Sequence, residues 1–292
     1  MIENEYQTHR SIEAYQRWYV ANEATLDQRY RFELALSGVL RTQELSIHCP
    51  LCLAEATLEV SAFPERHDVP VDWRECGKCA RCGMNCRLRL GLDLLRESVA
   101  NAKQPKIYMS EQATPAFAWV KRHYRSSIGS EYAPRPDARL RDYLRHLLED
   151  ASAEVRHEDI TRLSFDDRTF DAVASFEVLE HVPDYPLALS ELRRVLVPGG
   201  TLIVSVPFLP HAADTIVRAR RCADGTVEHL LDPEYHGDPV NGDGVLCYYN
   251  FGWDLVKAFE AAGFGEVEYI TAWSLRAGLF GASGLFRARR LG

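Results

Sequence analysis

Two CxxC motifs are the residues of this 292-residue chain whose types and spacing most clearly indicate chemistry. Cys49 and Cys52 form one pair and Cys79 and Cys82 the other, with residues 53–78 between them. Each motif presents two thiolates from a tight turn, so the two motifs together can complete a tetrahedron around Zn²⁺. Four protein thiolates leave zinc no open coordination position. We therefore predict a structural rather than a catalytic zinc site.

The cysteine spacing leaves one ambiguity about the ligands. Cys76 also forms a CxxC with Cys79, and Cys86 lies close by, so either could replace a proposed ligand. Unrelated buried cysteines are the alternative explanation, and the clustering disfavours it. We expect a cytoplasmic protein, and in a reducing cytosol clustered cysteines bind metals more often than they form a disulfide framework.

Basic residues surround the cysteines and could meet RNA or another anionic partner; they are Arg74, Lys78, Arg81, Arg87 and Arg89. The whole chain has 34 Lys and Arg against 42 Asp and Glu, a net charge of −8, which disfavours binding through phosphate neutralisation. Few aromatic residues are interleaved with these charges, so base stacking is poorly supported. We interpret them as a solvated face and do not expect a nucleic acid partner.

Three regions must position the residues that carry chemistry. Residues 1–46 form an N-terminal helical segment, with one or two helices expected in Ser11–Leu40, and residues 47–103 form the zinc-binding module. Residues 104–292 alternate strand and helix patterns, which predicts a parallel sheet with helices on both faces. The expected strands are Lys106–Ser110, Ser127–Tyr132, Phe170–Phe176, Thr201–Pro207 and Glu266–Ala272. The expected helices begin at Thr114-Pro115 and span Tyr185–Leu196 and Trp253–Ala262, with a turn at Pro198-Gly199-Gly200 and a stop at Gly263.

Residues 170–182 (FDAVASFEVLEHV) and 191–207 (ELRRVLVPGGTLIVSVP) strongly resemble the type 11 family of class I S-adenosylmethionine-dependent methyltransferases. With weaker flanks the resemblance covers about Lys106 to Ala272. It implies a Rossmann-like, seven-stranded sheet with S-adenosyl-L-methionine lying across the carboxyl ends of the first strands. The stretch 82–85 (CGMN), followed by Arg87, resembles the second knuckle of zinc ribbons that precede some bacterial methyltransferase domains, which favours Cys79 and Cys82 as ligands.

The resemblance implies cofactor contacts at matching positions. Glu131 matches the carboxylate that accepts hydrogen bonds from the ribose hydroxyls, and Asp159 matches the acid that meets the adenine amino group. Ile160 would lie beside the adenine ring, and Phe176 and Glu177 would line the methionine end. Each of these acids could instead be an exposed carboxylate at a strand end, but their order along the chain favours the cofactor roles.

The first loop departs from the family pattern, because residues 111–115 (EQATP) replace the glycine-rich GxGxG. Glycines there let the backbone approach the cofactor, and side chains would crowd it or redirect the loop. We expect this loop, with Glu111 and Thr114, still to bind the cofactor, the helix start near Thr114 offering N–H groups to its carboxylate. Some zinc-ribbon methyltransferases that this chain resembles also lack these glycines. If the side chain of Glu111 or Gln112 plugs the crevice, the enzyme prediction fails.

Histidines are the candidate general bases, because transfer of a methyl group to a hydroxyl requires removal of a proton. His181 follows the fourth strand of the family's sheet, and a long insertion carries Glu228-His229 and Tyr235-His236-Gly237-Asp238 where this fold builds its substrate lid. The alternatives are a structural histidine at position 181 and surface histidines at 229 and 236. Three aromatic residues could line the same site or pack in the core: Tyr248, Tyr249 and Trp253.

The function predicted from these features is methylation of an oxygen or nitrogen on a small molecule, a natural-product intermediate or a glycan intermediate. The alternatives are an RNA methyltransferase that uses the zinc module for RNA recognition, and a non-catalytic binding protein with the methyltransferase fold. The amino terminus does not resemble a secretory signal and no segment is long and apolar enough to span a bilayer, so we expect no membrane partner. The sequence leaves open the acceptor atom, the oligomeric state and chemistry other than methylation.

Overall fold

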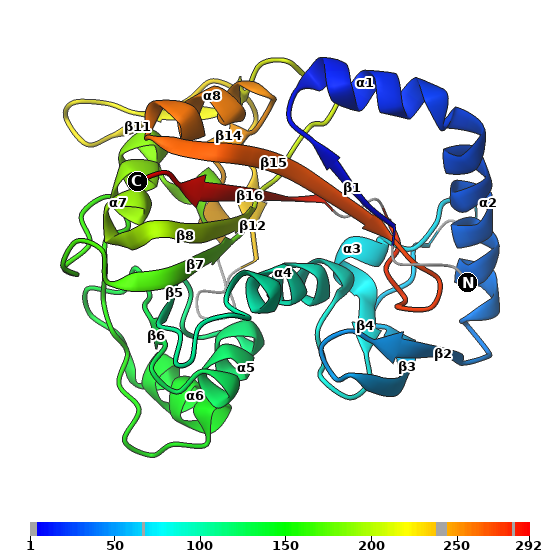
Figure 1. Ribbon diagram of the computed structural model, residues 1–292, viewed down its shortest axis with the longest axis horizontal. Coiled ribbons are helices and arrows are strands. Elements are labelled where there is room, and N and C mark those ends of the chain that lie inside the picture. Colours follow the sequence, from blue (N-terminus) through cyan, green and yellow to red (C-terminus); the bar gives the residue numbers. More distant parts are fainter. Residues whose placement is uncertain (1–4, 66–67, 238–243, 282–283) are drawn as a thin grey trace. The chain divides into compact units, whose positions relative to one another are not determined.

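The computed structural model describes residues 5–65, 68–237, 244–281 and 284–292 (Figure 1). The protein has two compact units, Met1–Glu97 with Glu268–Leu285 and Ser98–Val267 with Phe286–Gly292. Strands β15 (Phe264–Trp273) and β16 (Gly284–Arg290) pass from one unit into the other along the chain. The fold is α/β, with a seven-stranded mixed sheet in the order β1-β15-β16-β8-β7-β5-β6. The predicted helical segment and nearly all of the predicted zinc-binding module lie in the first unit.

Four parallel strands form the centre of the second unit, and Figure 1 shows them side by side. They are β5 (Ile107–Met109), β6 (Ile128–Gly129), β7 (Phe170–Phe176) and β8 (Leu196–Ser205). Every residue of β5 is buried, and so is all of β7 except Asp171. Such continuous apolar runs are typical of strands covered on both faces.

Two helices connect these strands in opposite directions along the sheet. Helix α5 (Pro115–His123) leads from β5 outward to β6, and α7 (Tyr185–Val195) leads from β7 to β8 on the other side. Because such crossovers are right-handed, the two helices must lie on opposite faces of the sheet. The direction reverses between β5 and β7. In open α/β sheets, ligands bind at this topological switch point, beside the carboxyl ends of the strands.

The predicted signals at helix ends are confirmed, and one predicted turn is displaced. Thr114 caps α5, its Oγ1 accepting a hydrogen bond from Phe117 N, and Gly263 adopts φ +89° directly after α8 (Asp254–Ala261) and its C-cap residue. The expected turn at residues 198–200 lies within β8, which begins at Leu196 as soon as α7 ends. Gly199 still adopts φ +79° there.

The sheet is mixed rather than purely parallel, and its outer strands differ from the prediction. The expected strand Ser127–Tyr132 is reduced to β6, after which the chain enters α6 (Ala138–Leu148). Beyond β6 there is only an isolated parallel bridge between Glu131 and His157. At the opposite edge β1 (Glu5–His9) pairs antiparallel with β15, and β16 pairs antiparallel with β8. The sequence patterns did not reveal β1 or β16.

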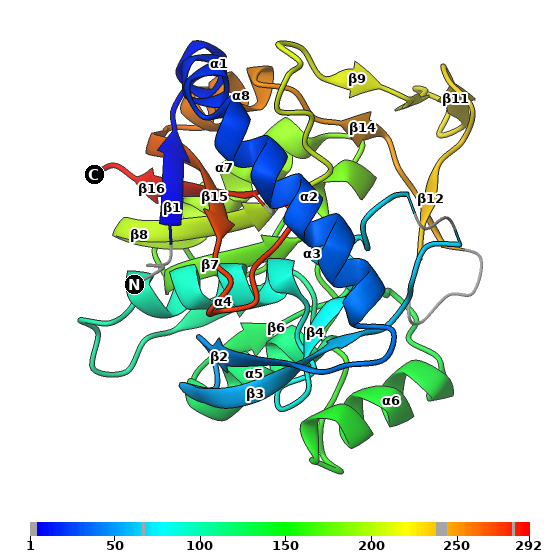
Figure 2. The same ribbon diagram turned by 90° about the vertical axis from the view of Figure 1, so that its right-hand side faces the viewer.

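The first unit combines helices with a small antiparallel sheet, as Figure 2 shows. The predicted helical segment contains α1 (Ile12–Ala21) and α2 (Glu23–Val39). The three-stranded sheet consists of β2 (Leu45–Cys49), β3 (Ala54–Val60) and β4 (Gly77–Cys79), and α3 (Trp73–Cys76) and α4 (Cys86–Ser98) flank β4 in the sequence. Trp73 is buried and packs edge-on against Phe280.

The predicted insertion between β8 and α8 is built from short paired strands, drawn in yellow and gold in Figure 2. They are β9 (Ile216–Val217), β10 (Ala219–Arg221), β11 (Val227–His229), β12 (Tyr235–His236), β13 (Val245–Leu246) and β14 (Tyr249–Asn250). The pairs are β9–β14, β10–β11 and β12–β13, all antiparallel.

Within the described ranges, none of the helices has the length and apolar character that a membrane-spanning helix requires.

Candidate functional site

The carboxylate of Glu111 lies at the topological switch point, between the carboxyl ends of β5 and β7. Glu111 Oε2 accepts a hydrogen bond from Phe176 N at 3.4 Å and lies 3.1 Å from Ser110 Oγ, which is 2.9 Å from Ser175 Oγ. All four of these residues are buried. A side chain is therefore held where the methyltransferase family has the first glycine of its loop.

The side chain of Gln112 turns away from the switch point, toward residues 154–156. Its Nε2 donates to Glu154 O at 3.0 Å, and its Oε1 accepts from Arg156 N at 2.9 Å. Gln112 thus pairs with the backbone of the segment that follows α6. Of the two side chains that could plug the crevice, only Glu111 lies between β5 and β7.

Glu131, the predicted ribose-binding carboxylate, also holds the first loop in place. Its Oε1 accepts hydrogen bonds from Gln112 N at 2.8 Å and from Ala113 N at 2.6 Å. A carboxylate offers about four lone-pair positions and can accept hydrogen bonds from several donors. Glu131 therefore helps to fix the position of the glycine-free loop through two of its N–H groups.

Asp159 and Ile160, predicted for the adenine end, follow a buried carboxylate that the sequence did not single out. Asp159 Oδ1 accepts from Thr161 N at 2.9 Å and from Thr161 Oγ1 at 2.6 Å, which closes a local turn, and Ile160 is buried. Glu158 is also buried. Burial alone would raise the pKa of Glu158, but hydrogen bonds from Ser164 and Arg156 outweigh it and lower the pKa below the usual value.

The chain is strained directly after β7, where the methionine end is predicted. Phe176 is buried, and Glu177 adopts φ +55° while its N–H donates to Ser205 O at 3.0 Å. A left-handed conformation at a residue other than glycine costs on the order of 1–3 kcal/mol and persists only where its surroundings enforce it. Such strain is concentrated at functional sites, and sequence patterns do not reveal it.

Two of the three predicted catalytic histidines meet around a buried glutamate. His181 lies with Glu180 in the short 3₁₀ helix Leu179–His181, and His236 lies in β12. Glu180 Oε1 is 3.7 Å from His181 Nε2 and 3.4 Å from His236 Nδ1, and the two imidazole centroids are 5.1 Å apart. We call Glu180, His181 and His236 the histidine cluster. The sequence placed Glu180 beside His181 but gave no sign that its carboxylate is buried.

Each histidine of the cluster is oriented through its other ring nitrogen. His181 Nδ1 lies 2.8 Å from Leu246 O, so it donates to that carbonyl and leaves Nε2 directed at Glu180. His236 Nε2 lies 3.1 Å from Glu234 Oε1. The neighbouring side chains of Cys247 and Glu180 raise the pKa of His236 to about 11, which favours its protonated form at neutral pH.

The other described residues that we predicted for the lid do not belong to the histidine cluster. His229, the third predicted base, is exposed in β11, and Asp238 lies outside the described residues. Tyr249 donates from its hydroxyl to Pro183 O at 2.6 Å, while the buried Trp253 donates to Pro210 O at 2.8 Å and packs on Phe208. Trp253 is therefore part of the core rather than of an aromatic wall.

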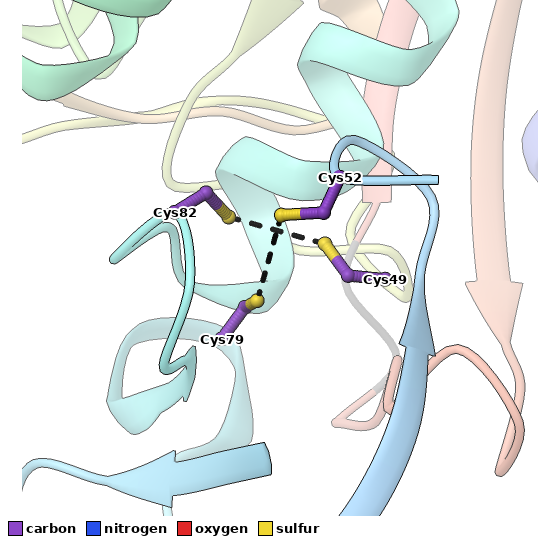
Figure 3. A group of neighbouring side chains, drawn as sticks. All are labelled: Cys49, Cys52, Cys79 and Cys82. Carbon is purple, nitrogen blue, oxygen red and sulfur yellow. Dashed lines mark hydrogen bonds between the residues drawn. The ribbon is translucent and has the colours of Figure 1, made fainter. Parts of the chain in front are cut away.

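The four predicted zinc ligands point toward a common centre, as Figure 3 shows. The Sγ atoms of Cys49 and Cys82 are 3.9 Å apart, and so are those of Cys52 and Cys79. Zn–S bonds of about 2.3 Å in a tetrahedron place sulfur atoms about 3.8 Å apart, so the spacing fits zinc.

Two matching turns hold these thiols. Leu53 N donates to Cys49 O at 2.9 Å, and Gly83 N donates to Cys79 O at 2.8 Å. Leu53 and Gly83 both adopt positive φ, at +51° and +71°. The alternative ligand Cys86 points elsewhere, because its Sγ lies 3.2 Å from Gly278 O, and Cys76 is not part of the group.

Two of the five basic residues near the cysteines, Arg87 and Arg89, do not lie on the solvated face that we predicted, whereas Arg81 is exposed. Arg89 is fully buried and donates to the carbonyl oxygens of Ala277 and Gly278. Arg87 is also buried and binds Glu75 through Nε and Nη2 at 2.7 and 3.0 Å. The expectation fails at these two positions because α4 is buried on most of its surface, so side chains on opposite sides of the helix are both covered. Such arginines are structural and unavailable to RNA.

Comparison with known proteins places a methyltransferase signature on the second unit. Residues 112–204, roughly a third of the chain, match the model of a family described as a methyltransferase domain. The match begins in the loop after β5 and ends in β8, so it contains the predicted cofactor residues Thr114, Glu131, Asp159, Ile160, Phe176 and Glu177.

Curated relatives match over short segments. A probable S-adenosylmethionine-dependent methyltransferase of Mycolicibacterium smegmatis is 41% identical over 54 residues, 18% of this chain and 21% of that protein. A demethylmenaquinone methyltransferase of Staphylococcus epidermidis is 47% identical over 60 residues, 20% of this chain and 25% of that protein. The chain thus spans about a quarter of the length of these relatives or less.

Among solved structures, the amino pentose methyltransferase CalS10 of Micromonospora echinaspora is 19% identical. The alignment covers 71% of this chain and 92% of that chain, with a TM-score of 0.47.

Proposed function

We propose that this protein is an S-adenosylmethionine-dependent methyltransferase that acts on an oxygen or nitrogen of a small molecule, a natural-product intermediate or a glycan intermediate. The observation that carries the proposal is the methyltransferase-domain match over residues 112–204, which coincides with the topological switch point. Glu131 and Asp159 both lie within this matched region, and a carboxylate can accept hydrogen bonds from several donors.

The residues present fit an adenosyl ligand. Glu131 would accept hydrogen bonds from the ribose hydroxyls, and Asp159 would accept one from the adenine amino group beside Ile160. Phe176 and Glu177 would bound the methionine end. When bound, S-adenosylmethionine supplies an electrophilic methyl group.

Proton removal from a hydroxyl acceptor is assigned in this proposal to His181. Since its Nδ1 donates to Leu246 O, its Nε2 is the nitrogen that can accept a proton. The buried carboxylate of Glu180, 3.7 Å away, would stabilise the imidazolium that forms. His236, held protonated by its acidic neighbours, would orient the acceptor as a hydrogen-bond donor rather than act as the base.

The cysteine group is proposed to hold a structural Zn²⁺. The ligands would be Cys49, Cys52, Cys79 and Cys82, which complete its coordination and leave no position for substrate. Because two ligands come from the turn after β2 and two from the turn after β4, the ion would join the ends of the small sheet. Because metal binding is coupled to folding, zinc would contribute to the folding free energy of this module.

A second candidate function, that of a binding protein with the methyltransferase fold and no methyl transfer, is favoured by one observation. The Glu111 carboxylate takes a hydrogen bond from Phe176 N at the switch point, where the family places a glycine. If that carboxylate stays in place, it competes with the cofactor for the same N–H group.

Calorimetric titration with S-adenosylhomocysteine separates the two candidates. We expect saturable binding to the natural protein, and unchanged or tighter binding to Glu111→Gly. The matched control is Glu149→Gly, which removes an exposed carboxylate at the end of α6, where φ is already +52°. Binding to Glu111→Gly alone would support the non-catalytic candidate. Absence of binding to all three proteins would overturn the proposal that Glu131 and Asp159 hold the cofactor.

A further inference from the structure

The three donor atoms of the histidine cluster are spaced as ligands of one small cation. Glu180 Oε1, His181 Nε2 and His236 Nδ1 all lie within 4.8 Å of one another, and the two distances to Glu180 Oε1 are 3.7 and 3.4 Å. Metal–ligand bonds of about 2.0–2.1 Å in a tetrahedron separate N and O donors by about 3.3 Å. A shift of a few tenths of an ångström would bring Glu180 Oε1 to that separation from each of the two imidazole nitrogens.

The surroundings of both imidazoles match those of metal-binding histidines. A ligating histidine typically donates its other N–H to a carbonyl or carboxylate, which fixes the tautomer and directs the free nitrogen at the ion. His181 Nδ1 is 2.8 Å from Leu246 O, and His236 Nε2 is 3.1 Å from Glu234 Oε1. The remaining nitrogens, His181 Nε2 and His236 Nδ1, therefore converge on Glu180.

The burial of Glu180 is a second, independent observation. The residue is fully buried, and within the described part of the chain neither carboxylate oxygen has a hydrogen-bond partner. A carboxylate removed from water without hydrogen bonds is strongly disfavoured unless a cation or a metal compensates for it. No Lys or Arg forms an ion pair with Glu180 in the described residues, so its charge is balanced either by the protonated imidazole of His236 or by a metal ion that displaces that proton.

We propose that Glu180, His181 and His236 bind a divalent first-row transition-metal ion, with Zn²⁺ as the reference case. Two imidazoles and one carboxylate suit such ions better than Mg²⁺ or Ca²⁺, which prefer all-oxygen sites. Three protein ligands leave at least one coordination position open, unlike the four cysteines. Glu234 and Cys247, which approach His236, are outer partners, since Glu234 binds its Nε2 and Cys247 donates to Tyr249 O.

This inference rests on the proposed function and narrows its substrate to a molecule with a hydroxyl group near the methyl donor. An oxygen bound at the open position would have its pKa lowered by the ion and lose its proton to water. The oxygen–methyl bond would then form as the methyl–sulfur bond of the donor breaks. In this state His181 is a ligand, and the ion takes over the role assigned above to His181 as a base.

Cobalt titration distinguishes the proposed site from the cysteine site. Protein whose cysteines are loaded with zinc is titrated with Co²⁺, and visible absorption and metal content are measured. We expect about one Co²⁺ per chain at a site of nitrogen and oxygen ligands, showing ligand-field bands without intense sulfur-to-cobalt charge transfer. Glu180→Gln and His236→Ala should each weaken this binding at least ten-fold, whereas His229→Ala, at an exposed histidine of the same insertion, should leave it unchanged.

The same samples are titrated with S-adenosylhomocysteine, so that failure of this inference is separable from failure of the proposed function. Cofactor binding without any Co²⁺ at this site would overturn the metal site and leave the proposed function standing. Co²⁺ binding that survives Glu180→Gln would also overturn it, because that isosteric variant keeps the packing and removes the anionic ligand.

Discussion

Replacement of Glu131 by alanine is expected to remove two hydrogen bonds that hold the loop after β5 and to destabilise the second unit. Glu131 Oε1 accepts two backbone N–H groups, at 2.8 and 2.6 Å, from the buried residues Gln112 and Ala113. A hydrogen bond to a charged group contributes about 1.5–3 kcal/mol, and the lower value applies here because Glu131 is half-buried. Two such bonds give a loss of about 3 kcal/mol for Glu131→Ala. Glu131→Gln keeps one carbonyl oxygen and should lose only about 1 kcal/mol.

Urea unfolding at neutral pH, followed by the fluorescence of the buried Trp119 in α5, measures these losses. Glu154→Ala is the control, because it removes an exposed glutamate whose backbone carbonyl alone binds Gln112. The midpoint should fall in the order natural protein and control, then Glu131→Gln, then Glu131→Ala. Equal stability of both Glu131 variants, or a loss below about 0.5 kcal/mol for alanine, would refute the idea that this carboxylate organises the loop.

Three further predictions concern single positions. The pKa of Glu158 is lower in the folded state than in the unfolded state, so its ionised form stabilises the fold above the unfolded pKa, and this stabilisation is lost as pH falls through the folded pKa. In urea unfolding, the stability difference between the natural protein and Glu158→Gln should be largest at neutral pH and shrink steadily below about pH 4. A difference that does not depend on pH contradicts this prediction. Cys52→Ser should release the cysteine-bound zinc, as measured by elemental analysis after dialysis, and lower the unfolding temperature of the first unit; full zinc retention would exclude Cys52 as a ligand. Gly252→Ala should lower the free energy of unfolding in urea by about 1–3 kcal/mol, because the added methyl would lie 2.5 Å from the backbone of Asp214. The control Gly237→Ala has open space for its methyl group and should leave the stability unchanged. Similar stability of the two variants would argue against close packing at Gly252.

Local sequence patterns predicted the elements whose packing is local. The apolar run of β7 and the amphipathic α7 were located to within a residue or two, and Thr114 caps α5 as expected. Strand β1 was missed because residues 5–9 carry no strong apolar alternation, and their partner strand lies more than 250 residues away. Its position depends on long-range pairing, which a single sequence does not specify.

The same contrast applies to the site. The group of four cysteines could be predicted from the CxxC spacing together with the zinc-ribbon resemblance of residues 82–85, which favoured Cys79 and Cys82 over Cys76 and Cys86. The contact of His236 with Glu180 could not, because it depends on the register of β12 and β13 in the insertion. The side chains of Arg87 and Arg89 are buried because α4 is covered on most of its surface, which the charge pattern did not reveal. The direction of the Glu111 side chain could not be predicted from the sequence either, because it depends on the contact with Phe176 N.

The central claim is that the switch point between β5 and β7 binds an adenosyl cofactor without the family's glycines. Thermal unfolding of the natural protein in rising S-adenosylhomocysteine concentration tests it most directly, because a ligand that binds only the folded state must stabilise it. We expect the unfolding temperature to rise steadily with ligand concentration, by an amount equivalent to about 2.7 kcal/mol when that concentration is a hundred times the dissociation constant. An unfolding temperature that does not change up to millimolar ligand would contradict it.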